Sequence, residues 1–336
     1  MSATPLLSVR DLETCFIQDE GVVHAVDKAS FDLWPGKTLG IVGESGCGKS
    51  VTTRSILQIL ERPGRLTGGE IWLNRDGQPP VDIAKLDPTG REMRNIRGKQ
   101  IALIFQEPMT SLSVHYTVGN QIGEAVLVHD PKSDKKAARA RTLALLRLVG
   151  IPQPERRIDE YPFQLSGGLR QRVMIAMALS CNPRILIADE PTTALDVTIQ
   201  AQVLNLIEGL RRDLGLAVIL ITHDMGIVAQ YADRLTVMYA GRVVESGAVA
   251  DIFAAPAHPY TRGLLASVPH LGDRWTRARQ RLPEIPGSVP TIMEQTTGCR
   301  FSPRCVMRIS RCIESPPLEP LEGGRTAACW RATEPA

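Results

Sequence analysis

The sequence predicts an α/β fold built around parallel strands, on three observations. Short apolar runs alternate with amphipathic helical patterns up to about residue 250, as in a parallel sheet whose strands are joined by helices. One run leads directly into a glycine-rich loop that opens a helix, which is half of a strand–helix–strand unit. A chain of 336 residues that is 43% apolar and 22% charged is typical of a globular protein, with about two domains.

The N-terminal third is expected to hold strands and one helix. Leu7–Leu12 and Val22–Leu33 have strand patterns, and Trp34–Lys37 is typical of a turn. Thr38–Val42 is a short apolar strand, and the glycine-rich loop after it opens a helix over about Lys49–Leu60.

Residues from about 107 to 180 are expected to be mostly helical. Ser133 suits a helix N-cap, and Gly150 suits the stop of the same helix. Two apolar strands, Ile185–Ala188 and Ala217–Thr222, follow along the chain. Between them lies an amphipathic helix whose apolar residues recur at a spacing of three to four: Ile199, Val203, Leu206, Ile207, Leu210 and Leu214.

The composition and the periodicity of the sequence change from about residue 251. Eleven of the 24 prolines lie in the last 86 residues, and clear periodicity is lost. We therefore divide the chain into a domain over residues 1–250 and a C-terminal extension over 251–336 with little secondary structure.

A phosphate-binding loop is predicted between the third strand and its helix. Residues 43–50 fit the pattern G-x-x-x-x-G-K-[ST]. Glycines let successive backbone N–H groups surround phosphates, and the helix directs its positive end at them. Lys49 then reaches the β- and γ-phosphates, and Ser50 Oγ binds Mg²⁺. The predicted nucleotide site comprises Gly43, Glu44, Ser45, Gly46, Cys47, Gly48, Lys49 and Ser50.

Four polar residues at the ends of apolar runs complete the predicted ATP site. Asp189 ends one run and can hold Mg²⁺ through water, while Glu190 can orient or deprotonate the attacking water. Gln106 ends another run, where its amide can contact Mg²⁺ and the same water. His223 follows a third run and can donate to the γ-phosphate.

A further motif, Leu-Ser-Gly-Gly-Leu-Arg-Gln at residues 165–171, lies between Gln106 and Asp189. With the other motifs and in this order, it resembles the signature of the ATP-binding-cassette (ABC) ATPases over roughly residues 6–250. The resemblance implies a P-loop NTPase fold: a RecA-like core, an antiparallel β subdomain and an inserted helical subdomain at about 107–180. It also implies that the signature acts in trans, on ATP held by the opposite subunit of an ATPase dimer, through Ser166, Gly167 and Gly168.

Two residues have two interpretations each. The resemblance implies an aromatic residue stacked on adenine, and Phe16, 33 residues before Lys49, is the candidate; the alternative is a core phenylalanine. Cys47 lies near a helix N-terminus, where a thiolate is favoured. Its alkylation would then block ATP binding, whereas the alternative is a small residue filling a small slot.

A narrower resemblance points to the oligopeptide/dipeptide importer ATPases. It is carried by Gln-Glu-Pro-Met-Thr-Ser-Leu at 106–112, Tyr-Pro-Phe-Gln at 161–164, His-Pro-Tyr-Thr-Arg-Gly-Leu at 258–264 and Ile-Pro-Gly at 285–287. The resemblance implies an ATP-hydrolysing subunit that powers an importer for peptides or similar solutes. Opines, nickel chelates or glutathione remain open as solutes.

The same resemblance implies the partners of the chain. These are a second, homologous ABC ATPase subunit in a heterodimer, two transmembrane permease subunits and, indirectly, an external solute-binding protein. It also implies a peripheral position at the cytoplasmic face of the inner membrane.

Other functional classes are disfavoured. No apolar stretch approaches the ~20 residues that span a bilayer, and no signal peptide is visible, so other chains would supply the membrane channel. A net charge of +3 disfavours a nucleic-acid binder. ABC ATPases that act on nucleic acid carry a long coiled-coil insertion or two cassettes, whereas only 60 residues separate Gln106 from Ser166 and one phosphate loop is present.

Four cysteines cluster in the C-terminal extension. Cys299, Cys305, Cys312 and Cys329 lie in a proline-rich segment without the short spacing of usual zinc sites, whereas iron–sulfur clusters tolerate wider spacing. In the importer ATPases the region resembles a tail that binds a [4Fe–4S] cluster, which is the prediction here. Zinc and free thiols remain alternatives, as does a redox-sensing role for the extension.

Overall fold

The structure, a computed structural model, describes residues 4–106, 111–193, 195–268, 284–290 and 297–333. It divides into two compact units. The first, the helical unit, consists of Trp34–Lys37 and Lys85–Ile221. The second, the phosphate-loop unit, contains Thr4–Leu33, Thr38–Ala84 and the chain from Thr222 onward.

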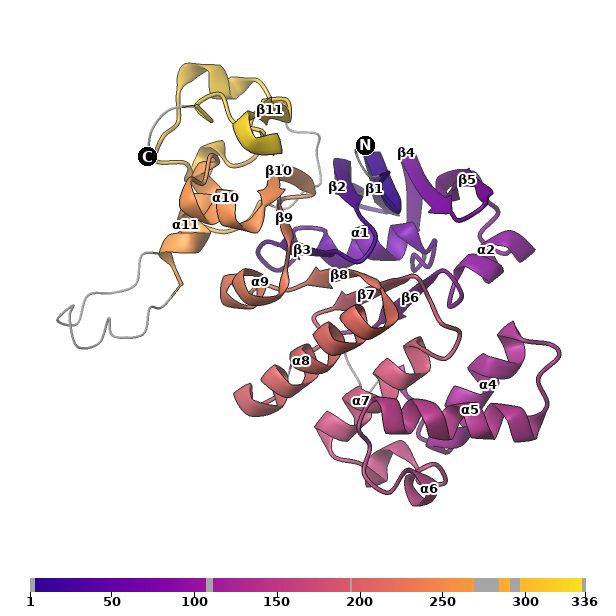
Figure 1. The fold of residues 1–336 in the computed structure, drawn as a ribbon. Coiled ribbons are helices and arrows are strands. Elements are labelled where there is room, and N and C mark those ends of the chain that lie inside the picture. The colour runs from indigo at the N-terminus through magenta and orange to yellow at the C-terminus, as the bar shows by residue number, and fades with distance from the viewer. Residues whose placement is uncertain (1–3, 107–110, 194, 269–283, 291–296, 334–336) are drawn as a thin grey trace, which may run out of the picture. The chain divides into compact units, whose positions relative to one another are not determined.

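Three parallel strands form the sheet of the helical unit, in the order β8 (Ala217–Ile221), β7 (Ile185–Asp189) and β6 (Ile101–Ile104). All five residues of β7 and of β8 are buried, which explains their continuous apolar runs. Among the described residues, the α-helices of this unit are α2 (Arg91–Ile96), α4 (Val118–His129), α5 (Lys135–Leu148), α6 (Pro154–Arg157), α7 (Gly167–Ala178) and α8 (Val197–Leu214) (Figure 1).

Side-chain caps define where two helices of this unit, α5 and α8, begin. The side chain of Asp134, not of the predicted Ser133, accepts the Ala137 N–H at 2.7 Å at the start of α5. Asp196 caps α8 in the same way, and Gly215 ends α8 in the left-handed conformation.

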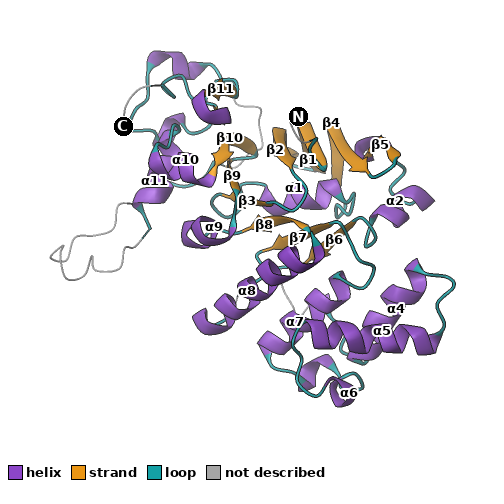
Figure 2. Cartoon of the chain, in the orientation of Figure 1, coloured by secondary structure: helices purple, strands orange, loops and turns teal. Residues whose placement is uncertain are grey.

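The phosphate-loop unit contains two sheets. One is antiparallel, in the order β2 (Gly21–Leu33), β1 (Leu7–Gln18), β4 (Gly64–Arg75) and β5 (Gln78–Asp82). The other includes β11 (Glu319–Leu321), β12 (Arg325–Ala327), β10 (Arg242–Ala248), β9 (Arg234–Tyr239) and β3 (Thr38–Val42), in that order. The α-helices in the described part of this unit are α1 (Lys49–Ile56), α9 (Met225–Tyr231), α10 (Val249–Ala254) and α11 (Pro259–Ala266) (Figure 2).

The C-terminal extension has more regular structure than its sequence predicts. Two short strands, β11 and β12, pair with each other, and β12 extends the sheet at β10 through Glu245 and Ala327. Helix α11 begins where His258 accepts the Tyr260 N–H and proline occupies the first helical position.

An aromatic cluster joins the extension to β9. Tyr239, at the end of β9, packs edge-on against Tyr260 at a centroid distance of 4.7 Å and against Phe301 at 5.2 Å. His258 packs against Phe301 at 5.6 Å. These four residues, which we call the aromatic cluster, are at most 4% exposed, so the extension shares the core of the phosphate-loop unit.

Burial of His258 makes the stability of this core depend on pH. Burial and the nearby Arg262 charge lower the pKa of His258 from 6.5 to about 3, so the imidazole stays neutral in the fold. The unfolded chain gains a proton there below about pH 6.5. From pH 7.5 to 5.5 we therefore expect this group to reduce the free energy of unfolding by about 1.4 kcal/mol.

Urea unfolding at the two pH values checks this expectation. His258→Asn keeps a side-chain acceptor at the helix N-cap and should lose this part of the pH dependence. An unchanged pH dependence in the variant would show that other groups cause it.

Candidate nucleotide site

The predicted phosphate loop connects β3 to α1, and two of its glycines cannot be replaced without a clash. A Cβ at Gly43 would lie 2.2 Å from the Met238 carbonyl oxygen, and one at Gly48 would lie 2.3 Å from the Ala25 carbonyl oxygen. Gly48 also has a φ of +97°, which disfavours any other residue. These constraints give the loop a fixed curvature at the N-terminus of α1, where backbone N–H groups are available to phosphates.

Lys49 is held over the loop by backbone carbonyls. Its Nζ donates to the Gly43 oxygen at 2.8 Å and to the Glu44 oxygen at 3.0 Å. The side chain is 5% exposed, so its charge is directed at the loop rather than at bulk solvent. Ser50 is the second residue of α1 and lies in its first turn.

Cys47 fills a small slot in the loop. It is fully buried, and burial raises the pKa of its thiol despite the opposing effect of Lys49. A buried neutral thiol reacts slowly with alkylating reagents. The structure therefore favours the interpretation of Cys47 as a packing residue.

In the helical unit the structure brings Gln106 and Glu190 together. Asp189 is the last residue of β7 and is 3% exposed. Glu190 follows with a φ of +45°, an uncommon conformation for a residue with a side chain. Its Oε2 accepts hydrogen bonds from Gln106 Nε2 at 3.1 Å and from Thr193 Oγ1 at 3.0 Å.

Thr193 is a site residue that sequence reasoning missed. Its position three residues after Glu190 is the only signal in the sequence, and many turns share that spacing.

The predicted Mg²⁺ ligands, Ser50, Gln106 and Asp189, offer hydroxyl, amide and carboxylate oxygens, which are the ligand types that Mg²⁺ prefers.

The signature motif begins a helix. Ser166 is the N-cap of α7, and its side chain makes no capping hydrogen bond. Ser166 and Gly167 are exposed, while a Cβ at Gly168 would lie 2.9 Å from Ile199 Cγ2. The first turn of this 12-residue helix therefore presents backbone N–H groups and the Ser166 hydroxyl to an anion.

The two remaining candidates lie in the phosphate-loop unit. His223 is exposed and immediately precedes Asp224, which caps α9 through the N–H groups of Gly226 and Ile227. Phe16 lies in β1 opposite Gly64, where a Cβ would come within 2.8 Å of the Phe16 ring. Phe16 is half-buried, so both interpretations of it stay open.

The prediction of a [4Fe–4S] tail is wrong on this structure. Over the residues that the structure describes, no group of three or more His, Cys, Asp or Glu side chains could hold a metal ion. The four cysteines of the extension form no disulfide, and burial raises the pKa of the Cys299, Cys305 and Cys329 thiols. Instead, Cys299 and Cys305 pack against the hydrophobic cluster around Tyr239 and Tyr260.

Across the described part of the chain, no helix combines the length and the hydropathy needed to cross a membrane.

Comparison with known proteins shows the family of the chain. Residues 26–193 match the ABC transporter family, and residues 244–312 match the C-terminal region of the oligopeptide/dipeptide transporters. A probable peptide ABC transporter ATP-binding protein of Sinorhizobium fredii is 52% identical, over 98% of this chain and 96% of the relative. A dipeptide transport ATP-binding protein of Bacillus subtilis is 49% identical, over 97% and 94% of the two chains.

Solved structures show the same fold. A dimeric bacterial ABC transporter cassette matches with a TM-score of 0.63 and 26% identity, over 72% of this chain and 98% of the cassette. A component of an ABC transporter complex from Clostridium perfringens matches with a TM-score of 0.61 and 28% identity, over 74% and 91% of the two chains. The predicted α/β fold of the P-loop NTPase type is thereby confirmed.

Proposed function

Because the chain belongs to the ABC transporter ATPases of the oligopeptide/dipeptide type, we propose that it hydrolyses ATP to power a peptide importer. The observation that carries this proposal is the combination of an ABC cassette with the C-terminal region of peptide transporters in one chain, matched along 98% of its length by a peptide transporter relative. We retain the division into an ATPase domain over 1–250 and an extension over 251–336.

Each site residue has a proposed role in ATP hydrolysis. The loop from Gly43 to Gly48 surrounds the phosphates, and Lys49 neutralises charge on the β- and γ-phosphates. Ser50, Gln106 and Asp189 would hold Mg²⁺, and the bound ion would shield the phosphate charges. Phe16 is the candidate for stacking on adenine.

The attacking water is activated in the helical unit. Glu190 accepts a proton from the water as it adds to the γ-phosphorus, and ADP leaves with the electrons of the broken P–O bond. Gln106 and Thr193 both donate to Glu190 Oε2, so they orient the carboxylate for that transfer. His223 donates to the γ-phosphate. Ser166, Gly167 and Gly168 of this chain contact the γ-phosphate of the ATP that the opposite subunit holds.

The chain requires a partner, because its signature motif acts on ATP that a second cassette holds. We propose that the chain pairs with a second, homologous ABC ATPase and that the pair docks on two permease subunits at the cytoplasmic face of the membrane. A relative of known structure is itself a dimeric cassette. Closure around ATP and reopening after hydrolysis would then move the permeases, while an external binding protein supplies the solute.

Native mass spectrometry of the detergent-solubilised complex, isolated through a tag on this chain, tests these partners. We expect one copy of this chain, one copy of a homologous ATPase and two permease subunits. Recovery of two copies of this chain with the permeases would replace the heterodimer by a homodimer. Recovery without any membrane subunit would contradict the importer assignment.

A further inference from the structure

Glu44, the second residue of the phosphate loop, is held by the C-terminal extension through both its backbone and its side chain. Its backbone N–H donates to Tyr260 Oη at 2.8 Å, and its Oε2 accepts from Arg304 Nη1 at 2.9 Å. The carbonyl oxygen of the same residue accepts from Lys49 Nζ at 3.0 Å. One residue thus connects two side chains of the extension to the lysine that is proposed to bind ATP.

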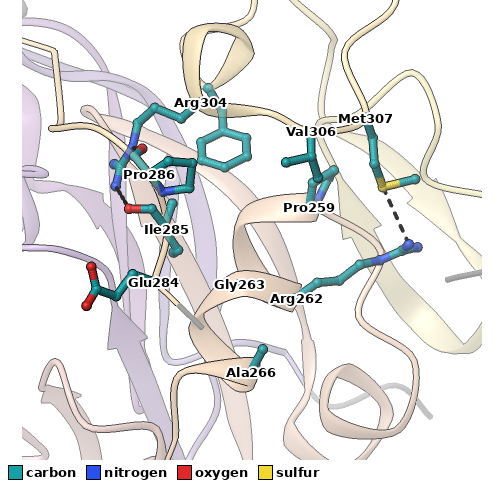
Figure 3. A pocket seen from close by; sticks show the side chains of 11 residues that line it. Pro259, Arg262, Gly263, Ala266, Glu284, Ile285, Pro286, Arg304, Val306 and Met307 are labelled. Atoms are coloured by element: carbon teal, nitrogen blue, oxygen red, sulfur yellow. Dashed lines mark hydrogen bonds between the residues drawn. The ribbon is translucent and has the colours of Figure 1, made fainter. Parts of the chain in front are cut away.

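The Arg304 side chain that pairs with Glu44 is also held by other contacts within the extension and β9. Its Nε donates to the Pro286 oxygen at 2.7 Å, and its Nη2 donates to the Ile285 oxygen at 3.3 Å, as the close-up in Figure 3 shows. Its Nη1 also approaches Tyr239 Oη at 3.4 Å. The guanidinium is planar, so these bonds set the direction of the nitrogen that faces Glu44. The side chain is 6% exposed.

Tyr260 is fixed equally well. It is fully buried, and its ring packs against Tyr239 at 4.7 Å and Phe301 at 5.5 Å. Burial, with a further contribution from the Glu44 charge, raises the pKa of Tyr260 far above its ordinary value of 10. The hydroxyl therefore stays neutral and available to accept the Glu44 N–H.

The charge of Glu44 requires compensation in this place. It is the only acidic residue between positions 43 and 50, and a carboxylate beside a triphosphate is repulsive. Its Oε1 is buried without a hydrogen-bond partner among the residues described. The ion pair between Oε2 and Arg304 is therefore the contact that offsets the negative charge, and burial keeps solvent from screening it fully.

We propose that Arg304 and Tyr260 are positioning residues for ATP binding: Tyr260 holds the backbone of Glu44, and Arg304 neutralises its carboxylate. The two motifs of the extension, at 258–264 and 285–287, then have a shared role. Tyr260 contacts Glu44 directly, and the Ile285 and Pro286 carbonyls hold the Arg304 side chain that pairs with Glu44. The proposal rests on the proposed function, since it requires ATP at this loop.

Nucleotide affinity of the full-length chain tests the role of Arg304. In equilibrium titrations with a fluorescent ATP analogue and Mg²⁺, Arg304→Met should weaken binding about tenfold, because it leaves an unpaired carboxylate beside the phosphates. Glu44→Gln in the Arg304→Met background removes that carboxylate and should restore the dissociation constant to within about threefold of wild type.

Arg262→Met is the matched control. Arg262 lies in the same extension, but its guanidinium donates to the Pro256 oxygen and contacts the Met307 sulfur instead of the loop. We expect its ATP affinity to equal that of wild type. Tyr260→Phe keeps the ring packing and removes the acceptor, and we expect binding about threefold weaker.

Several outcomes would overturn the proposal. Wild-type affinity in Arg304→Met and in Tyr260→Phe would remove the positioning role altogether. A double variant that binds no more tightly than Arg304→Met would show that Arg304 acts only by supporting the fold, since a substitution in the loop cannot repair a misfolded extension. Absence of ATP binding in wild type would overturn the proposed function as well, whereas equal affinities in all variants would overturn this inference alone.

Discussion

Replacing Glu190 with glutamine is expected to reduce ATP turnover at least about 100-fold while ATP binding stays within about threefold of wild type. The glutamine amide has the same shape as the carboxylate and can still accept hydrogen bonds from Gln106 and Thr193. It cannot accept a proton from water at neutral pH. The change therefore removes a transition-state role and preserves the ground-state site.

Phosphate release by the assembled ATPase pair and titration with a fluorescent ATP analogue measure the two effects separately. Glu155→Gln is the control, because Glu155 pairs with Arg147 on an exposed surface of the helical unit. Turnover close to wild type in Glu190→Gln would assign the general base to another residue. Loss of binding together with turnover would indicate that Glu190 supports the structure of the site.

Replacing Lys49 with methionine is expected to weaken ATP binding at least about 100-fold, which corresponds to about 2.7 kcal/mol. Methionine has nearly the same length, but it cannot donate to the Gly43 and Glu44 carbonyls or to phosphates. The lysine is 5% exposed, so no other cation is expected to replace it from solvent.

Isothermal titration with ATP and Mg²⁺ measures this loss. Lys136→Met, on the exposed surface of α5, is the matched control and should bind as wild type does. Thermal unfolding of both variants separates an effect on ATP from an effect on folding. An affinity within threefold of wild type for a folded Lys49→Met would contradict the proposed role of the loop.

Much of the fold and the site motifs could be predicted because local sequence requires them. The apolar runs at β7 and β8 are fully buried strands, and Gly43 and Gly48 occupy positions where a side chain would collide with backbone. The start of α5 was misplaced by one residue, because Ser133 and Asp134 are both good N-caps and only the fold decides between them.

The C-terminal extension was predicted least well. Strands β11 and β12 are three residues long each, too short for a periodic pattern, and they depend on pairing with β10. The ion pair between Glu44 and Arg304 joins residues 260 positions apart, and no local pattern reports such a contact. The iron–sulfur prediction failed because the spacing of cysteines along the sequence does not determine whether their thiols lie around a common point in the fold.

Peptide transport by the reconstituted complex tests the central claim most directly. The chain would be isolated with its membrane subunits, placed in liposomes and supplied with ATP and a mixture of short peptides. Mass spectrometry would then measure peptide that crosses the bilayer. We predict ATP-dependent peptide movement that is lost with Glu190→Gln in this chain. ATP hydrolysis without peptide movement, in the presence of the binding protein, would contradict the assignment as a peptide importer ATPase.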